Sequence, residues 1–270
     1  MCFSGHRCPS IILKVIELEV KEVMNIALLS GEILLTSGSE IYRVEDTIDR
    51  ICDAYGIECE SFVTPTGIII SGKSSDGSNE SVSMVKRIRN RTINLHNIEI
   101  INTFSRELQL STLSYDAAMD KLNGIKTAPY FSFVKRLLAA GFTSFAYTVL
   151  LKGTVIDGVF AALISLLIYS FLEQMKKVNF SQYFGNFLCS LAAGLVSISA
   201  GKLISSLNVD SIIVGSIMIL VPGLAITNGI RDALHGDILS SQARITEALI
   251  VVTSIGVGVA ISLLLMKYWM

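Results

Sequence analysis

Five long apolar stretches in the second half of the chain constrain its fold more than any other feature. Each is close to the roughly 20 residues that an α-helix needs to cross about 30 Å of hydrocarbon. One such stretch alone could be a buried core helix, but five in succession predict a membrane bundle. The predicted spans cover residues 131–151, 154–172, 184–204, 211–230 and 248–266.

Charge divides the chain in the same place. Residues 1–130 carry 30 charged side chains, whereas residues 131–270 carry only 15. A chain that changes solvent halfway along has this composition. Lys135 and Arg136 interrupt the first apolar stretch near its start, where long basic side chains can reach the headgroups. The net charge of -1 provides no basic excess for nucleic-acid binding.

Basic residues in the loops orient the predicted bundle. Under alternating topology, one side of the membrane receives Lys135, Arg136, Lys176, Lys177, Arg231 and Arg244. The other side receives Lys152, Lys202 and Lys267. The positive-inside rule therefore places residues 1–130 in the cytosol and the C-terminus outside.

The first half predicts a separate α+β domain, so the fold class is a cytosolic α+β domain followed by an all-α membrane bundle. Two amphipathic helices flank Ser37-Gly38, and two strands flank a turn at residues 64–67. A third strand and two helices follow, giving the order helix, helix, three strands, helix, helix. The later elements are expected at about 82–89, 94–110 and 114–124.

The domain boundaries follow from these patterns. We expect an N-terminal tail over 1–18, the cytosolic domain over 19–126 and the transmembrane domain over 127–270, with a linker at 124–129. The tail does not have the pattern of a signal peptide, because its apolar patch is short and is followed by Lys14.

Sequence motifs for catalysis, cofactors or metals are absent. The chain has no Gly-rich phosphate loop, nucleophile elbow or His-Glu-x-x-His motif. Its cysteines lack the paired spacing of metal ligands, and their odd number argues against a disulfide framework. We therefore expect no cofactor and no metal. The carboxylates Glu40, Glu45, Asp46 and Asp49 could form an acid–base or metal site, although a solvated, salt-bridged helix face is the more ordinary interpretation.

A charged loop follows a predicted break in the fourth span. Pro222 lacks an amide proton and frees a backbone carbonyl, and Gly223 beside it favours a broken helix. Charges beside such a break are costly unless they line a water-filled path or pair with one another. The charged residues here are Arg231, Asp232, Asp237, Arg244 and Glu247.

Two segments resemble motifs of the bacterial threonine/serine exporter family. Residues 37–47, Ser-Gly-Ser-Glu-Ile-Tyr-Arg-Val-Glu-Asp-Thr, are similar to the opening motif of that family. Residues 221–248 resemble its Pro-Gly…Thr-Asn-x-x-Arg-Asp…Gly-Asp…Arg…Glu-Ala pattern. The first motif, whose role is unknown, comprises Ser37, Gly38, Glu40, Tyr42, Arg43, Glu45 and Asp46.

The resemblance implies a subunit of a two-component exporter. Full-length members join two membrane halves, and this chain resembles only the half with the soluble domain. In split members the second half is a separate small membrane protein, and such pairs are linked to export of amino acids or succinate. The expected partners are therefore that protein, the lipid bilayer and further copies in an oligomer.

Charged and polar residues in or beside the predicted spans are candidates to line the transport path, because they are unfavourable in hydrocarbon. They are Asp157, Asn228, Arg231, Asp232, Asp237, Arg244 and Glu247. Arg231 could bind a substrate carboxylate in bidentate geometry, and the acids could bind an ammonium group or protons. A structural network such as Arg231–Asp237 or Arg244–Glu247 is the alternative. Asp157 could relay protons or cap its helix.

The function expected from these features is secondary export of small carboxylate metabolites, threonine and serine first. Proton coupling is expected because the sequence has no nucleotide-binding motif. One alternative is a dicarboxylate such as succinate as the substrate. The other is a membrane-tethered hydrolase or sensor in which the soluble domain does the work.

Overall fold

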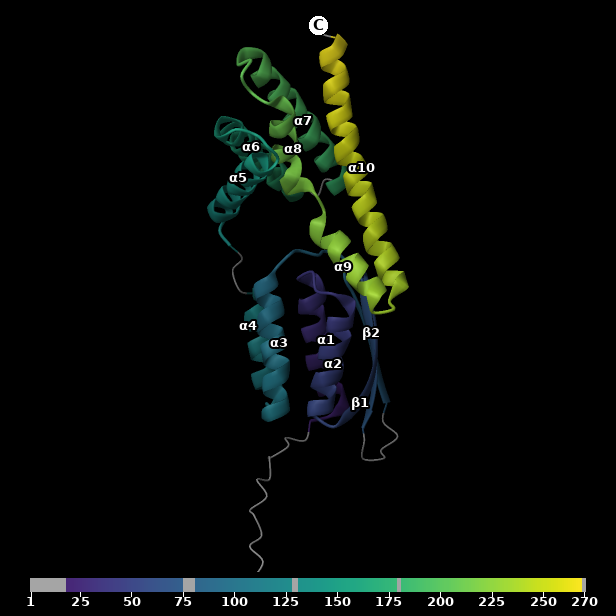
Figure 1. Cartoon of the computed structure of the whole chain (residues 1–270). Helices are drawn as coiled ribbons and strands as arrows, with labels where there is room; N and C mark the ends of the chain where they lie inside the picture. Colours follow the sequence, from purple (N-terminus) through teal and green to yellow (C-terminus); the bar gives the residue numbers. More distant parts are fainter. Residues whose placement is uncertain (1–17, 75–80, 128–130, 179–180, 269–270) are drawn as a thin grey trace, which may run out of the picture. The chain divides into compact units, whose positions relative to one another are not determined.

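The computed structural model describes residues 18–74, 81–127, 131–178 and 181–268 (Figure 1). The chain divides into two compact units. Unit 1 comprises Met1–Ala128 with Arg231–Ser240, and unit 2 comprises Pro129–Ile230 with Ser241–Met270. The predicted N-terminal tail lies outside the described residues except for its last position, Leu18.

Unit 1 has the predicted order of elements. They are α1 (Val20–Thr36), α2 (Ile41–Ala54), β1 (Ile57–Thr64), β2 (Gly67–Ser74), β3 (Ser81–Arg87), α3 (Leu95–Leu110) and α4 (Tyr115–Thr127). The predicted linker is wrong at its start, because α4 continues through Gly124 to Thr127. A helical glycine costs about 1 kcal/mol, but Lys126 forms an ion pair with Glu32 of α1 and Leu122 is fully buried. These contacts hold the last turn of α4 against α1.

Three layers build this unit. The strands form an antiparallel sheet in the order β1-β2-β3. Helices α1 and α2 lie between that sheet and the pair α3 and α4 (Figure 1). Their apolar faces are therefore covered on both sides, and Met24, Ile48, Ile68 and Ile101 have no exposed surface. Burial of this kind contributes roughly 25 cal/mol for each Å² of apolar surface.

Unit 2 is helical. Its elements are α5 (Phe133–Leu150), α6 (Val155–Lys177), α7 (Gln182–Leu203), α8 (Val209–Ile217), the 3₁₀ turn η1 (Met218–Leu220), α9 (Gly223–Leu234) and α10 (Ile238–Tyr268). Helix α6 packs against α5, α7 and α8. The last turn of α9 and the first residues of α10 belong to unit 1.

Within the described part of the chain, length and composition identify three single helices that could cross a membrane. They are α6, α7 and residues Ile238–Met266 of α10. A fourth span exists if α8 with η1 and α9 count as one, and these two parts are bent by 60° at Val221-Pro222. Helix α5, with 18 residues, is not among them. The five-span layout thus remains a prediction, whereas several apolar helices of spanning length are present.

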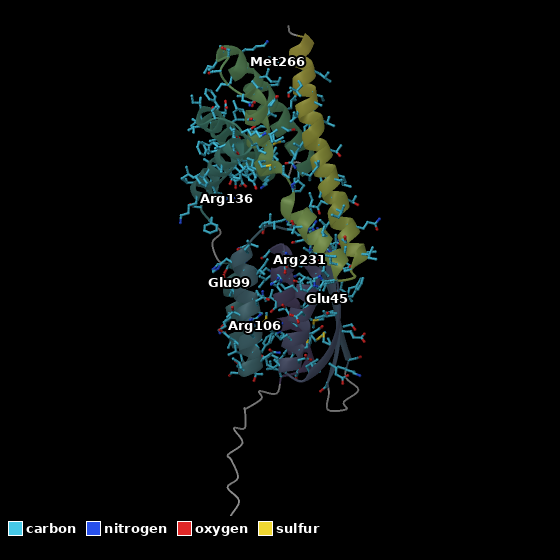
Figure 2. All side chains as sticks on the ribbon, viewed as in Figure 1. Glu45, Glu99, Arg106, Arg136, Arg231 and Met266 are labelled. Atoms are coloured by element: carbon cyan, nitrogen blue, oxygen red, sulfur yellow. The ribbon has the colours of Figure 1, made fainter. Side chains whose placement is uncertain are left out.

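The basic start of α5 has a specific partner. Arg136 (Figure 2) donates to the Glu173 carboxylate at 3.1 Å and to the Tyr169 hydroxyl at 3.2 Å, both on α6. Lys176 also contacts Glu173 at 3.2 Å. Because a charge near hydrocarbon is costly when unpaired, this pairing accounts for Arg136 better than the predicted snorkelling does.

Small residues allow α7 and α10 to approach closely. A Cβ atom added to Gly258 would overlap the Ser190 hydroxyl and lie 2.6 Å from the Phe187 carbonyl oxygen. A Cβ atom added to Gly194 would overlap Ser262. Packing between helices in a membrane depends on such positions, because lipid is as apolar as a leucine side chain.

We expect Gly258→Ala to lower the thermal stability of the detergent-purified chain by roughly 1–3 kcal/mol, since the added methyl meets backbone that cannot move aside. Gly256→Ala on the same helix is the matched control, because a Cβ there meets no atom within 4 Å. Comparing both variants with the wild type in a melting experiment tests the packing. Equal melting temperatures for the two variants would contradict it.

Candidate functional site

The first segment that carries the family resemblance meets the middle part of the second within unit 1. We call residues 37–46 together with residues 231–240 the motif junction. Residues 37–46 lead from α1 into α2, and residues 231–240 lead from the last turn of α9 into α10. About 190 residues of sequence separate Glu40 from Arg231, yet the two side chains are in contact.

Glycines turn the chain sharply in both segments. Gly38 and Gly236 have φ angles of 86° and 90°, in the left-handed region that side chains disfavour. In each turn, the amides of the glycine and of the next residue donate to carbonyls near the end of the helix, those of Leu35 and Leu34 or of Ala233 and Asp232. This is the Schellman arrangement that ends helices. Gly38 and Gly236 therefore have a structural role.

Glu40 is shared between two arginines. One carboxylate oxygen contacts Arg231, and the other accepts a hydrogen bond from Arg43 Nε at 2.9 Å. The Glu40 side chain is only 9% exposed, whereas that of Arg231 is 43% exposed. Burial works to raise the pKa of Glu40, but its backbone hydrogen bond and the two arginines outweigh burial and lower that pKa. Glu40 is therefore a carboxylate at neutral pH.

Two further contacts join the segments. The Asp232 carboxylate accepts a hydrogen bond from the backbone amide of Ile41 at 3.1 Å, so it satisfies an amide at the start of α2. The rings of Tyr42 and His235 stack in parallel with centroids 3.9 Å apart. An ion pair, a helix cap and a ring stack thus hold the motif junction together.

Acidic groups gather beside these contacts. Glu45 accepts from the backbone amide of Val63 at 3.1 Å. Burial raises the pKa of Glu45, and repulsion from Asp237, Asp49 and Asp232 adds to that rise. Figure 2 shows Glu45 and Arg231 at the same end of unit 1. The motif junction therefore combines Glu40, which is paired with two arginines, with aspartates whose negative charge repels that of Glu45.

Sequence reasoning named both segments but not their pairing. Arg231 pairs with Glu40, and not with Asp237, which was one partner considered for a structural network. Asp237 instead accepts the amide of Ser240 at 3.1 Å and caps the start of α10. Glu40 is 7% exposed as a residue, which does not fit a solvated helix face. The ion pair between Asp46 and Arg50 does fit the salt-bridged face that was expected. Within the described residues, no cluster of His, Cys, Asp or Glu could hold a metal ion.

The other predicted path residues lie in unit 2. Asp157 accepts hydrogen bonds from the Thr154 amide and hydroxyl at 2.7 and 2.8 Å and from the Asn208 amide at 2.9 Å. It therefore caps α6 and ties that helix to the start of α8. Asn228 and Arg244 are buried at 6% and 4% exposure. Pro222 and Gly223 lie at the break before α9, and Glu247 is on α10.

Comparison with known proteins identifies the family. A family model described as "Putative threonine/serine exporter" matches residues 25–266. The chain belongs to the threonine/serine exporter family. No solved structure matches it. The match covers residues of both units, including both segments of the motif junction.

Two curated relatives carry the same description. The chain is 25% identical over 250 residues to "Probable threonine/serine exporter" of Mycobacterium tuberculosis, covering 92% of this chain and 47% of that protein. It is 23% identical over 254 residues to "Threonine/serine exporter" of Corynebacterium glutamicum, covering 90% and 52%. The chain thus spans about half the length of these relatives. Both printed names describe transporters, and neither describes a hydrolase.

We expect Glu45→Gln to change how stability depends on pH. A raised pKa means that the folded state holds the Glu45 proton more tightly than the unfolded chain does. Stability is therefore lost as pH rises from the ordinary value of 4.5 through the raised pKa. Glutamine keeps the acceptor for Val63 and carries no charge, so the variant should gain in melting temperature over the wild type as pH increases.

Melting curves of the full chain between pH 4 and 8 measure this difference. Glu99→Gln is the control, because its side chain is 80% exposed and lies on α3. If the difference in melting temperature between Glu45→Gln and wild type stays constant across this range, the pKa of Glu45 is not raised in the folded state.

Proposed function

We propose that the chain is a membrane subunit of a secondary exporter of small carboxylate metabolites, with threonine and serine as its substrates. The observation that carries this proposal is the family match over residues 25–266. The soluble part faces the cytosol, as the distribution of loop lysines and arginines favours. The bundle lies in the inner membrane of a bacterium, as the resemblance to the bacterial exporter family implies.

A second membrane half completes the exporter in this proposal. The curated relatives are about twice as long as the part that this chain matches. A separate small membrane protein would supply the other half, and the two proteins would form a hetero-oligomer. This arrangement predicts that neither protein transports alone.

We place substrate and ion binding at the break before α9 and at the charged residues that follow it. A helix broken at Pro222 exposes backbone groups that can hold a carboxylate or a coupling ion. Arg231 supplies a guanidinium for a substrate carboxylate. Asp232, Asp237, Arg244 and Glu247 remain candidates for binding the ammonium group or protons, with Asn228 as a neutral hydrogen-bonding group. Asp157 is assigned to structure, because its oxygens already accept three hydrogen bonds.

An export assay tests this proposal. Cells would be loaded with a threonine-containing dipeptide or with succinate and would express this chain, the second half, both or neither. We expect threonine efflux only with both proteins, and slower efflux when a protonophore collapses the pH gradient. Efflux of succinate alone would reassign the substrate, and the absence of any difference would refute the exporter.

Arg231→Gln should abolish efflux in this assay at a normal protein level, because glutamine offers no cation to a carboxylate. Arg106→Gln is the matched control. This arginine is exposed on α3 (Figure 2), and its substitution removes an equal positive charge from the same unit. Unchanged efflux by Arg231→Gln would remove Arg231 from the path.

A further inference from the structure

The guanidinium proposed to bind substrate already holds a carboxylate of the protein. Arg231 contacts Glu40, which lies at the start of α2 and far away in the sequence. A substrate carboxylate would present the same chemical group to the same arginine. We propose that Glu40 is a built-in competitor for Arg231, and that the carboxylate of the exported metabolite binds by displacing it. This inference rests on the proposed function.

Differences in exposure allow such an exchange. The Arg231 side chain is 43% exposed, so a small anion from solvent can reach it while it contacts Glu40. The Glu40 side chain, at 9%, is almost covered. The incoming carboxylate therefore approaches the arginine rather than the glutamate. Guanidinium presents several N–H donors in one plane, which suits the stepwise replacement of one carboxylate by another.

Arg43 stabilises Glu40 after the ligand has displaced it from Arg231. A buried carboxylate that loses its only cation would be left uncompensated, which is strongly unfavourable. Glu40 keeps a second cation, because Arg43 Nε donates to its other oxygen at 2.9 Å. Arg43 itself lies one turn along α2 and so moves with Glu40. Glu40 can thus release Arg231 and remain paired.

The exchange also weakens the motif junction. Of the three contacts that join its segments, the ion pair is the one that a soluble carboxylate can replace. In the cap from Asp232 to Ile41 the donor is an uncharged backbone amide, and the stack of Tyr42 on His235 contains no carboxylate, so neither offers the ligand a cation. Ligand binding at Arg231 therefore removes one of the contacts between α2 and residues 231–240 and leaves the cap and the ring stack in place.

Direct binding to the purified full chain tests the exchange, with threonine as the probe and threonine amide as the ligand that lacks a carboxylate. Isothermal titration would give the affinity of each variant. Glu40→Gln removes the competitor, and we expect it to bind threonine about fivefold more tightly than the wild type. Arg231→Gln should not bind. Threonine amide should not bind to any variant.

A second variant moves the affinity in the opposite direction. Arg43→Gln leaves Glu40 with Arg231 as its remaining arginine partner among those described, so displacement becomes more costly and threonine should bind more weakly. Glu99→Gln is the control for a lost acidic charge. Melting temperatures confirm that each variant is folded.

The results separate the alternatives. Tighter binding by Glu40→Gln with weaker binding by Arg43→Gln supports the exchange. Glu40→Gln that binds no more tightly than wild type, or that does not bind at all, overturns it, and Glu40 is then a fixed structural partner. If no efflux is detected while the affinities change as expected, the exporter proposal is refuted and the carboxylate-binding site at Arg231 is supported.

Discussion

The pairing of Glu40 with two arginines is the interaction on which the motif junction depends. A carboxylate that is almost covered must be paired, because an isolated buried charge costs several kcal/mol. Arg43 alone could pair with it from within α2. The additional contact with Arg231 is what brings residues 231–240 to the start of that helix. The cap on Ile41 and the ring stack of Tyr42 then add directional contacts, so the segment has a defined orientation as well as a position.

Much of unit 1 could be predicted because its signals are local. Alternating and helical apolar spacing gave the element order, and the Ser37-Gly38 boundary between α1 and α2 is where a Schellman turn needs glycine. The end of α4 could not be predicted in this way. Gly124 suggests an end to the helix, but the ion pair of Lys126 with Glu32 depends on a residue more than 90 positions earlier.

The partner of Arg231 was beyond sequence reasoning for the same reason. The sequence offered Asp237 as one structural alternative, and the structure uses Asp237 to cap α10. Glu40 belongs to a motif that had been interpreted as a separate helix face. In unit 2, the break at Pro222 could be anticipated because proline acts on its own backbone. The pairing of Arg136 with Glu173 and the hydrogen bond from Asn208 to Asp157 require the packing of α6 against α5 and α8.

Charge at the motif junction bears on which carboxylate the proposed exporter would carry. Arg231 offers one positive group, and the same unit holds Glu45, Asp232 and Asp237, of which the two aspartates oppose the negative charge of Glu45. A dicarboxylate such as succinate could place one carboxylate on Arg231, but its second would meet these acids. An amino acid would place its ammonium group there instead, where opposite charge is attractive. Under the proposed function, this distribution of charge favours a zwitterionic ligand over a dicarboxylate.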